Sequence, residues 1–149
     1  MAAETLAHFR GNPLRGLTLM TNGGGAGVMA ADAAALAGID LPALSEPLRS
    51  RLDAVLPPTW SRGNPIDIIG DAPVVRYTET LRALLDDRDA GTVLFMHAPT
   101  AIVRSEDIAR ACAPLARAMS SLRTIAVGAC MNSTVPASRS SSRARSVSV

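Results

Sequence analysis

Glycines are concentrated in residues 22–27, which read Asn-Gly-Gly-Gly-Ala-Gly. Because glycine has no side chain, the backbone here can turn tightly and another group can approach its amides closely. The apolar residues that follow predict a helix, whose first amides lack an intrahelical acceptor and carry about half a positive charge. Such a turn can hold an anion without any basic side chain. The segment therefore predicts either an anion-binding turn or a tight strand-to-helix connection without a ligand.

Residues 25–30 also satisfy G-x-G-x-x-A, the fingerprint of dinucleotide-binding proteins. That fold requires a carboxylate about 20 residues further on, at the end of the second strand. Glu46 lies at this distance, but it directly follows Ser45 in the first turn of a predicted helix. Acidic residues are common there because they suit the helix dipole. The pattern therefore favours an anion over a dinucleotide.

Other residues allow both a functional and a structural interpretation. His97, at the end of a predicted strand, could orient a substrate or simply be hydrogen-bonded at the rim of the sheet. Asp32 could act across a domain interface or be a solvated acid. Trp60 follows two prolines, and we expect its large ring to anchor that loop. The two cysteines, Cys112 and Cys130, lack metal-ligand spacing, so we expect buried thiols and no metal site.

The composition excludes several classes of protein. All 15 basic residues are arginine. Without lysine, neither a phosphate loop of the G-x-x-x-x-G-K-[ST] type nor a Schiff-base enzyme is possible. Arg139, Arg143 and Arg145 lie near the C-terminus, and removing these three from the 15 leaves 12 arginines against 13 acids. The remainder is not basic, so we expect no nucleic-acid partner.

The elements that position these residues alternate between strand and helix. We expect strands at residues 17–21, 39–44, 65–69, 92–97 and 124–128. Helices are predicted at 28–37, after caps at Ser45 and Asp71, and from Ser105, with Pro114 inside the last. Right-handed crossovers turn this order into an α/β, three-layer doubly wound parallel sheet of about five strands. Ligands bind such folds at the carboxyl ends of the strands, where Asn22, Gly70 and His97 are expected.

The predicted helices carry apolar faces that define the core. Residues 28–37 are apolar on nearly every face, so we expect that helix to be covered on both sides. In the other helices, inward-facing positions recur at helical spacing. They are Leu48, Leu52, Val55, Leu56, Tyr77, Leu81, Leu84, Leu85, Ile108, Ala111, Cys112, Leu115 and Met119.

The domain organisation follows from length and composition. The chain of 149 residues is long enough for one domain, which we place at residues 11–130. Residues 1–10 are interpreted as the end of a preceding linker or helix, and the Ser/Arg-rich residues 131–149 as a disordered tail. No apolar run reaches the roughly 20 residues that cross a bilayer, and no signal peptide is recognisable. We therefore expect a cytoplasmic protein without a membrane partner.

Two motifs carry a family resemblance. TNGGGAGVMAAD at residues 21–32 and LPPTWSRGNPIDIIGD at residues 56–71 resemble the NDP-forming acyl-CoA synthetase superfamily. It includes ADP-forming acetate–CoA ligases, succinyl-CoA synthetases and the synthetase-like region of bacterial protein lysine acetyltransferases. The tryptophan in the second motif favours a resemblance to that last group or its close relatives. The resemblance covers about residues 10–130 and implies one flavodoxin-like (succinyl-CoA synthetase-like) domain of a much longer protein.

The resemblance also implies roles for particular residues. The glycine-rich turn would start a helix that points its N-terminus at a phosphohistidine, so that the phosphate-facing residues are Asn22, Gly23, Gly24, Gly25 and Gly27. The second loop of the family corresponds to Asn64, Asp67 and Gly70. Residues 97–100, with His97 and Thr100, fall where succinyl-CoA synthetases place a glycine-rich loop near the acyl substrate. Here Ala98 and Pro99 replace those glycines.

The expected function is that of an isolated or truncated domain of an ADP-forming acyl-CoA (acetate–CoA) ligase. The family's phosphohistidine lies upstream in a small-His-Thr/Ala-Gly motif, and neither His8 nor His97 has such neighbours. We therefore expect no catalytic residue here, and an inactive chain unless CoA-binding, phosphohistidine and ATP-grasp domains complete it. The parent family uses CoA, ATP/ADP and Mg, none of which we expect this chain to bind alone. The alternative is a non-catalytic, acyl-CoA-responsive regulatory module of a protein lysine acetyltransferase.

Overall fold

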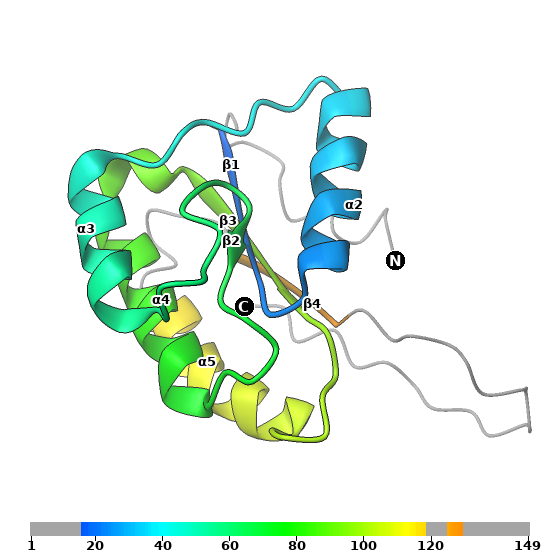
Figure 1. Ribbon diagram of the computed structural model, residues 1–149, viewed down its shortest axis with the longest axis vertical. Helices are drawn as coiled ribbons and strands as arrows, with labels where there is room; N and C mark the ends of the chain where they lie inside the picture. Colours follow the sequence, from blue (N-terminus) through cyan, green and yellow to red (C-terminus); the bar gives the residue numbers. More distant parts are fainter. Residues whose placement is uncertain (1–15, 119–124, 130–149) are drawn as a thin grey trace, which may run out of the picture.

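The computed structural model describes residues 16–118 and 125–129, to which the structural statements below refer. They form a four-stranded parallel sheet in the order β2-β1-β3-β4. The strands are β1 (Leu17–Thr21), β2 (Ile66–Asp67), β3 (Thr92–His97) and β4 (Ile125–Ala129). Helices and strands alternate along the chain, as Figure 1 shows. The α/β fold with a parallel sheet, expected from the sequence, is confirmed.

The helices divide unequally between the two faces of the sheet (Figure 1). One face carries α2 (Gly24–Leu36), and the other carries α3 (Glu46–Val55), α4 (Val74–Asp86) and α5 (Ser105–Ala118). A short 3-10 turn, η1 (Arg88–Ala90), leads into β3. The main core lies on the three-helix face, because its cluster joins residues of α3, α4 and α5 to inward-facing residues of the strands.

The register of the strands explains which side chains enter this core. Met20 of β1 pairs with Phe95 of β3, and both are buried in the cluster. Most of the helical positions predicted to face inward are also buried, and Val55 and Leu115 pack against the cluster while partly exposed. The fully buried large side chains are Tyr77, Phe95, Leu19, Met20, Leu48, Leu52, Ile66, Ile68, Leu81, Leu84, Ile108 and Val93.

The strand predicted at residues 39–44 is wrong, because this segment has no regular structure. Pro42 lacks an N–H, and the side chain of Asn64 takes the backbone groups of β1 that a pairing strand would use. Asn64 Oδ1 accepts from Leu19 N at 2.9 Å, and Nδ2 donates to Leu17 O at 2.8 Å and to Pro42 O at 3.1 Å. As a result, β2 pairs with β1 only at Ile66 and Asp67.

The predicted helix starts are confirmed in part. Ser45 caps α3, with its Oγ accepting from Leu48 N at 3.3 Å. The cap predicted at Asp71 is wrong: α4 begins at Val74 after Pro73, without a side-chain cap. The Asp71 carboxylate instead accepts a hydrogen bond from Arg76 at 2.6 Å, because this ion pair competes with capping. In α2, the helix begins at Gly24, four residues before the predicted start.

The expected covering of the first helix is also wrong. Only Gly27 and Ala34 of α2 are buried. Because α2 is the single described helix on its face, its outward side has no neighbouring layer among the described residues (Figure 1). Val28 is 61%, Met29 74% and Leu36 91% exposed.

The predicted structural roles of Trp60 and Cys112 are confirmed. Trp60 is 4% exposed and its Nε1 donates to Asp53 at 2.8 Å, which anchors the loop to α3. Cys112 is a buried free thiol. Cys130, Met119 and the tail at residues 131–149 lie outside the described residues, as does the segment 1–10. No helix among the described residues is long and apolar enough to span a membrane.

We predict that Asn64→Ala lowers the free energy of unfolding by about 2–3 kcal/mol, because one buried N–H and two carbonyls lose their partner. Asn64→Asp keeps an acceptor for Leu19 N but turns a carboxylate towards two carbonyl oxygens, so its loss should be at least as large. Urea unfolding checks both. Thr78→Ala, at a partly exposed site on α4, is the control. A loss in Asn64→Ala no greater than the control's would contradict this role.

Candidate functional site

The carboxyl ends of β1 and β3 are joined by the side chain of Asn22. Its Oδ1 accepts from Ala98 N at 2.7 Å and its Nδ2 donates to Ala98 O at 2.9 Å. Asn22 is 2% exposed. The structure thus brings the glycine turn beside the segment that follows His97, as the sequence predicted, but the Asn22 amide is already engaged within the protein.

The first turn of α2 offers free backbone donors. Gly23, the N-cap residue, is extended (φ −140°, ψ 111°) and provides no side-chain cap. Gly27 N donates to Gly23 O at 3.1 Å, which is the first hydrogen bond of the helix. The amides of Gly24, Gly25 and Ala26 precede it, and the described residues supply no acceptor for them. These N–H groups are the donors that the anion-binding hypothesis requires.

The four glycines of the turn serve different purposes, although none adopts a positive φ. A Cβ on Gly23 would lie 3.1 Å from Ala98 Cβ, and one on Gly27 would lie 3.1 Å from Thr21 Cγ2. A Cβ on Gly24 would lie 3.0 Å from Asp67 Oδ2. At Gly25 the space is open, with nothing within 4 Å. Close packing therefore accounts for three of them, and Gly25 faces the space through which a ligand would approach.

Asp67 places a carboxylate next to the free amides. Its Oδ1 accepts from Ile69 N at 2.9 Å, while Oδ2 lies beside Gly24. A carboxylate near a helix N-terminus is favourable for the helix dipole, but it repels an incoming phosphoryl group. A ligand that fits here must present a hydrogen-bond donor or a positive charge to Asp67 and an anion to the amides.

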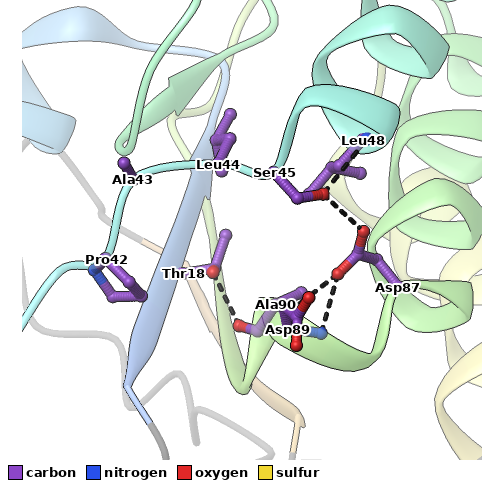
Figure 2. A pocket seen from close by; sticks show the side chains of 9 residues that line it. All are labelled: Thr18, Pro42, Ala43, Leu44, Ser45, Leu48, Asp87, Asp89 and Ala90. Atoms are coloured by element: carbon purple, nitrogen blue, oxygen red, sulfur yellow. Dashed lines mark hydrogen bonds between the residues drawn. The ribbon is translucent and has the colours of Figure 1, made fainter.

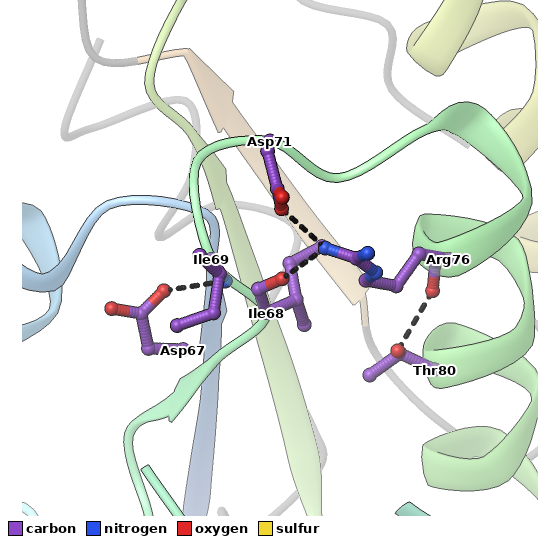
Figure 3. Close-up of polar contacts among 6 residues, drawn as sticks. All are labelled: Asp67, Ile68, Ile69, Asp71, Arg76 and Thr80. Atoms are coloured by element: carbon purple, nitrogen blue, oxygen red, sulfur yellow. Dashed lines mark hydrogen bonds and ion pairs between the residues drawn. The ribbon is translucent and has the colours of Figure 1, made fainter. Parts of the chain in front are cut away.

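An arginine that the sequence analysis did not single out fixes the second loop (Figure 3). Arg76 donates through Nη1 to Ile68 O at 3.2 Å and to Asp71 Oδ1 at 2.6 Å. Its side chain is only 19% exposed. The spacing of Arg76, five residues after Asp71, was the one feature of the sequence that could have indicated this ion pair. This contact orients residues 68–71, and Gly70 in that loop lies next to Asn22 O.

His97 faces away from the glycine turn. Thr21 packs against Gly27 and pairs with Met96, so Met96 is on the α2 face of β3 and His97 is on the opposite face. There His97 Nδ1 lies 3.3 Å from the Tyr77 hydroxyl, and the two rings meet edge to face. The buried His97 Nε2 has no hydrogen-bond partner among the residues that the structure describes. Thr100, predicted to lie near the same substrate, is partly buried in the following loop.

Burial sets the protonation states of this pair. It lowers the pKa of His97 from its usual 6.5, because the imidazolium would lose hydration without gaining a counter-ion. Burial also raises the pKa of Tyr77 to about 12, and the nearby Cys112 contributes to the same shift. At neutral pH the contact therefore joins a neutral imidazole and a protonated phenol.

A small pocket with fewer groups for catalysis or binding lies at the opposite end of β1, between Thr18, Pro42, Ser45 and Asp87 (Figure 2). Its polar groups are engaged with one another: Thr18 Oγ1 donates to Ala90 O, and Ser45 Oγ donates to Asp87 Oδ2. Within residues 16–118 and 125–129, no group of three or more His, Cys, Asp or Glu side chains could hold a metal ion.

We predict that His97 makes the protein less stable in mild acid. Its pKa is lower in the folded state than in the unfolded state, so the unfolded chain binds the proton first as the pH falls below about 6.5. The free energy of unfolding should decrease from about pH 7.5 to about pH 5.5, and His97→Phe should remove this part of the decrease. His8→Asn, as control, should retain it. Urea titrations at both pH values test this, and equal slopes in wild type and His97→Phe would contradict it.

Comparison with known proteins agrees with the fold. The model of the Ligase-CoA domain family matches residues 17–134. Acetate–CoA ligase (ADP-forming) I of Archaeoglobus fulgidus is 39% identical over 85 residues, which are 57% of this chain and 12% of that protein. The 4-hydroxybutyrate–CoA ligase (ADP-forming) of Nitrosopumilus maritimus is 31% identical over 93 residues, 62% of this chain and 13% of that protein.

Solved structures give the same result. The dinucleotide-forming acetyl-coenzyme A synthetase 1 of Ca. Korarchaeum cryptofilum, in complex with phosphate and ADP, has a TM-score of 0.73 and 31% identity, covering 79% of this chain and 26% of that chain. PH0766 of Pyrococcus horikoshii has a TM-score of 0.67 and 27% identity, covering 79% and 28%. The chain thus spans about an eighth of these curated relatives and about a quarter of these solved chains. It belongs to the Ligase-CoA domain family, within the NDP-forming acyl-CoA synthetase superfamily.

Proposed function

We propose that this chain acts as one domain of an ADP-forming acyl-CoA ligase, in which the N-terminus of α2 holds a phosphoryl group carried on a histidine of another domain. The observation that supports this most is the set of three free amides at Gly24, Gly25 and Ala26. They begin a helix of 13 residues whose first turn contains no acidic residue. Donors fixed in this way bind an anion without the cost of reorganising solvent or side chains.

The position of Asp67 supports a phosphorylated imidazole rather than a simple phosphate. When its ring is protonated, an imidazole phosphorylated on one nitrogen presents an N–H on its other nitrogen and a positive charge. That N–H could be bound by Asp67 Oδ2 while the phosphoryl oxygens bind the amides next to Gly24. Free phosphate lacks the positive charge of a protonated imidazole, so the Asp67 carboxylate would make it bind more weakly. The glycine turn and Asp67 thus favour a histidine-borne group together.

The whole ligase would convert acyl-CoA, ADP and phosphate to a carboxylate, CoA and ATP. In this proposal the CoA-binding, phosphohistidine and ATP-grasp domains supply the remaining sites, including those for the nucleotide and Mg. This chain alone is then inactive. Thr100 remains the candidate for contact with the acyl substrate, whereas the side chain of His97 packs on α4 and could act on substrate only indirectly. The cytoplasmic location stays a prediction.

The relatives that match this chain favour the ligase over the regulatory module of an acetyltransferase, because their names describe ADP-forming ligases. A regulatory module would also have no need for a first helical turn free of capping side chains, since its helix could be capped like α3.

We predict that inorganic phosphate, used as a simple probe, shifts the amide resonances of Gly24, Gly25 and Ala26 in ¹⁵N–¹H spectra, with an affinity on the order of millimolar. Gly25→Val should abolish the shifts, because its side chain fills the open space at the turn without clashing with the fold. Ala35→Val, on the exposed C-terminal part of α2, is the matched control. Shifts that persist in Gly25→Val, or that occur only near arginine side chains, would contradict anion binding at these three amides.

We further predict that supplying the missing domains of the ligase restores phosphoryl transfer to ADP. In that complex Gly25→Val should reduce the rate on the order of 10²-fold, as expected when fixed backbone donors are blocked. Ala35→Val should leave the rate unchanged. The measurement is the formation of ATP from acyl-CoA, ADP and phosphate. A wild-type rate in Gly25→Val would refute the role of the turn while leaving the family assignment intact.

A further inference from the structure

Asn22 connects the segments that leave three different strands. Its side chain lies at the end of β1, is 2% exposed, and forms two hydrogen bonds with Ala98, which follows β3. Its backbone oxygen lies close to the loop after β2, since a Cβ on Gly70 would be 3.5 Å from Asn22 O. The free amides of residues 24–26 follow β1, and Thr100 follows β3. Both therefore belong to segments that Asn22 holds together.

The hydrogen bonds of the Asn22 side chain lie beyond the paired part of the sheet. β1 pairs with β3 along its whole length, up to Thr21 and Met96. The end of β3 is held to α4 by the contact of His97, on the face of the sheet opposite the glycine turn. Neither contact acts on the segments that continue from the two strands. The Asn22 side chain does, and it thereby sets how far these segments can diverge.

The residue type at position 22 matches this contact. Asn22 Oδ1 accepts from Ala98 N at 2.7 Å while Nδ2 donates to Ala98 O at 2.9 Å, so one primary amide satisfies both backbone groups of the same residue. A carboxylate could only accept, and an alkyl side chain could do neither. Because the side chain is buried, water competes little for these bonds. Ala98 therefore cannot move away from Asn22 without breaking both.

The position of Ala98 in turn affects the N-terminus of α2. A Cβ on Gly23 would lie 3.1 Å from Ala98 Cβ, so the methyl group of Ala98 packs directly against the N-cap residue. Gly23 is extended there, and its carbonyl accepts from Gly27 N at 3.1 Å. The amides of residues 24–26 come directly after Gly23, so their direction depends on its conformation. Asn22 thus acts on these donors through Ala98.

We propose that Asn22 is a positioning residue, which fixes the free amides of residues 24–26 relative to the loop 98–100. Its side chain contacts no ligand, because the amide is engaged by Ala98. The inference rests on the proposed function, in which those amides hold the phosphoryl group and Thr100 is the candidate for contact with the acyl substrate. The turn and the loop then form one preorganised unit, and an anion does not have to order the turn when it binds.

The test measures the dissociation constant of inorganic phosphate for the full chain, from the amide shifts of residues 24–26 at constant ionic strength. We expect Asn22→Ala to raise this constant about tenfold, because the turn is no longer preorganised. Thr18→Ala is the matched control, since it removes another buried hydrogen bond of β1, to Ala90 O, at the opposite end of the strand. It should lower the melting temperature and leave the dissociation constant unchanged. A purely structural role of Asn22 would give that same result in Asn22→Ala, because binding is measured on the folded protein.

A measurement on the wild type covers the case in which Asn22→Ala does not fold. Phosphate should shift the side-chain amide of Asn22 and the N–H of Ala98 with the same dissociation constant as the amide of Gly25. If these two resonances stay in place while that of Gly25 moves, the positioning role is overturned and the anion-binding turn stands. Equal dissociation constants in wild type and Asn22→Ala would have the same meaning. If no resonance of the turn moves, the proposed phosphoryl-binding role fails, and the positioning role fails with it.

Discussion

The fold depends on two asparagine side chains, which satisfy backbone groups of β1 and of Ala98, the residue that follows β3. A parallel sheet normally does this with a full strand on each side. On one side β1 has β3 along its whole length, but on the other it has only the two-residue strand β2. Asn64 supplies hydrogen bonds to Leu19 N and Leu17 O, which β2 does not reach. Asn22 supplies a pair of hydrogen bonds to Ala98, just after the end of β3. Unpaired, these groups would each cost a desolvation penalty.

The site is a consequence of that constraint. Because Asn22 holds Ala98 directly beside Gly23, a side chain at the N-cap position would be crowded, and the helix begins without a side-chain cap. The amides of the first turn of α2 therefore remain free at the carboxyl edge of the sheet. The arrangement that closes the strand ends is thus also the one that leaves donors available to an anion.

The sequence predicted the elements that depend on local pattern and missed those that depend on contacts distant along the chain. β3 was predicted with its true bounds because its run of apolar residues needs no partner to be recognised. The segment 39–44 has a similar local pattern. However, the side chain of Asn64, distant along the chain, forms the hydrogen bonds with β1 that a strand at 39–44 would have formed. Asp71 resembles a helix cap, and only the structure shows that Arg76 engages it. The orientation of His97 likewise depends on strand register, which local sequence does not specify.

The glycine turn also shows why a motif can be recognised before its physics is understood. Glycine was expected there for its freedom of backbone rotation, yet none of the four glycines uses a positive φ. A side chain would be crowded by Ala98 at Gly23, by Thr21 at Gly27 and by the Asp67 carboxylate at Gly24. Packing favours glycine at those three positions even without a ligand, so their presence alone says little about binding. Gly25 is different, because nothing in the described fold excludes a side chain there, and a helix gains stability when glycine is replaced. Gly25 is therefore the part of the motif that packing does not explain, and the open space beside it is what the proposed approach of a phosphoryl group would need.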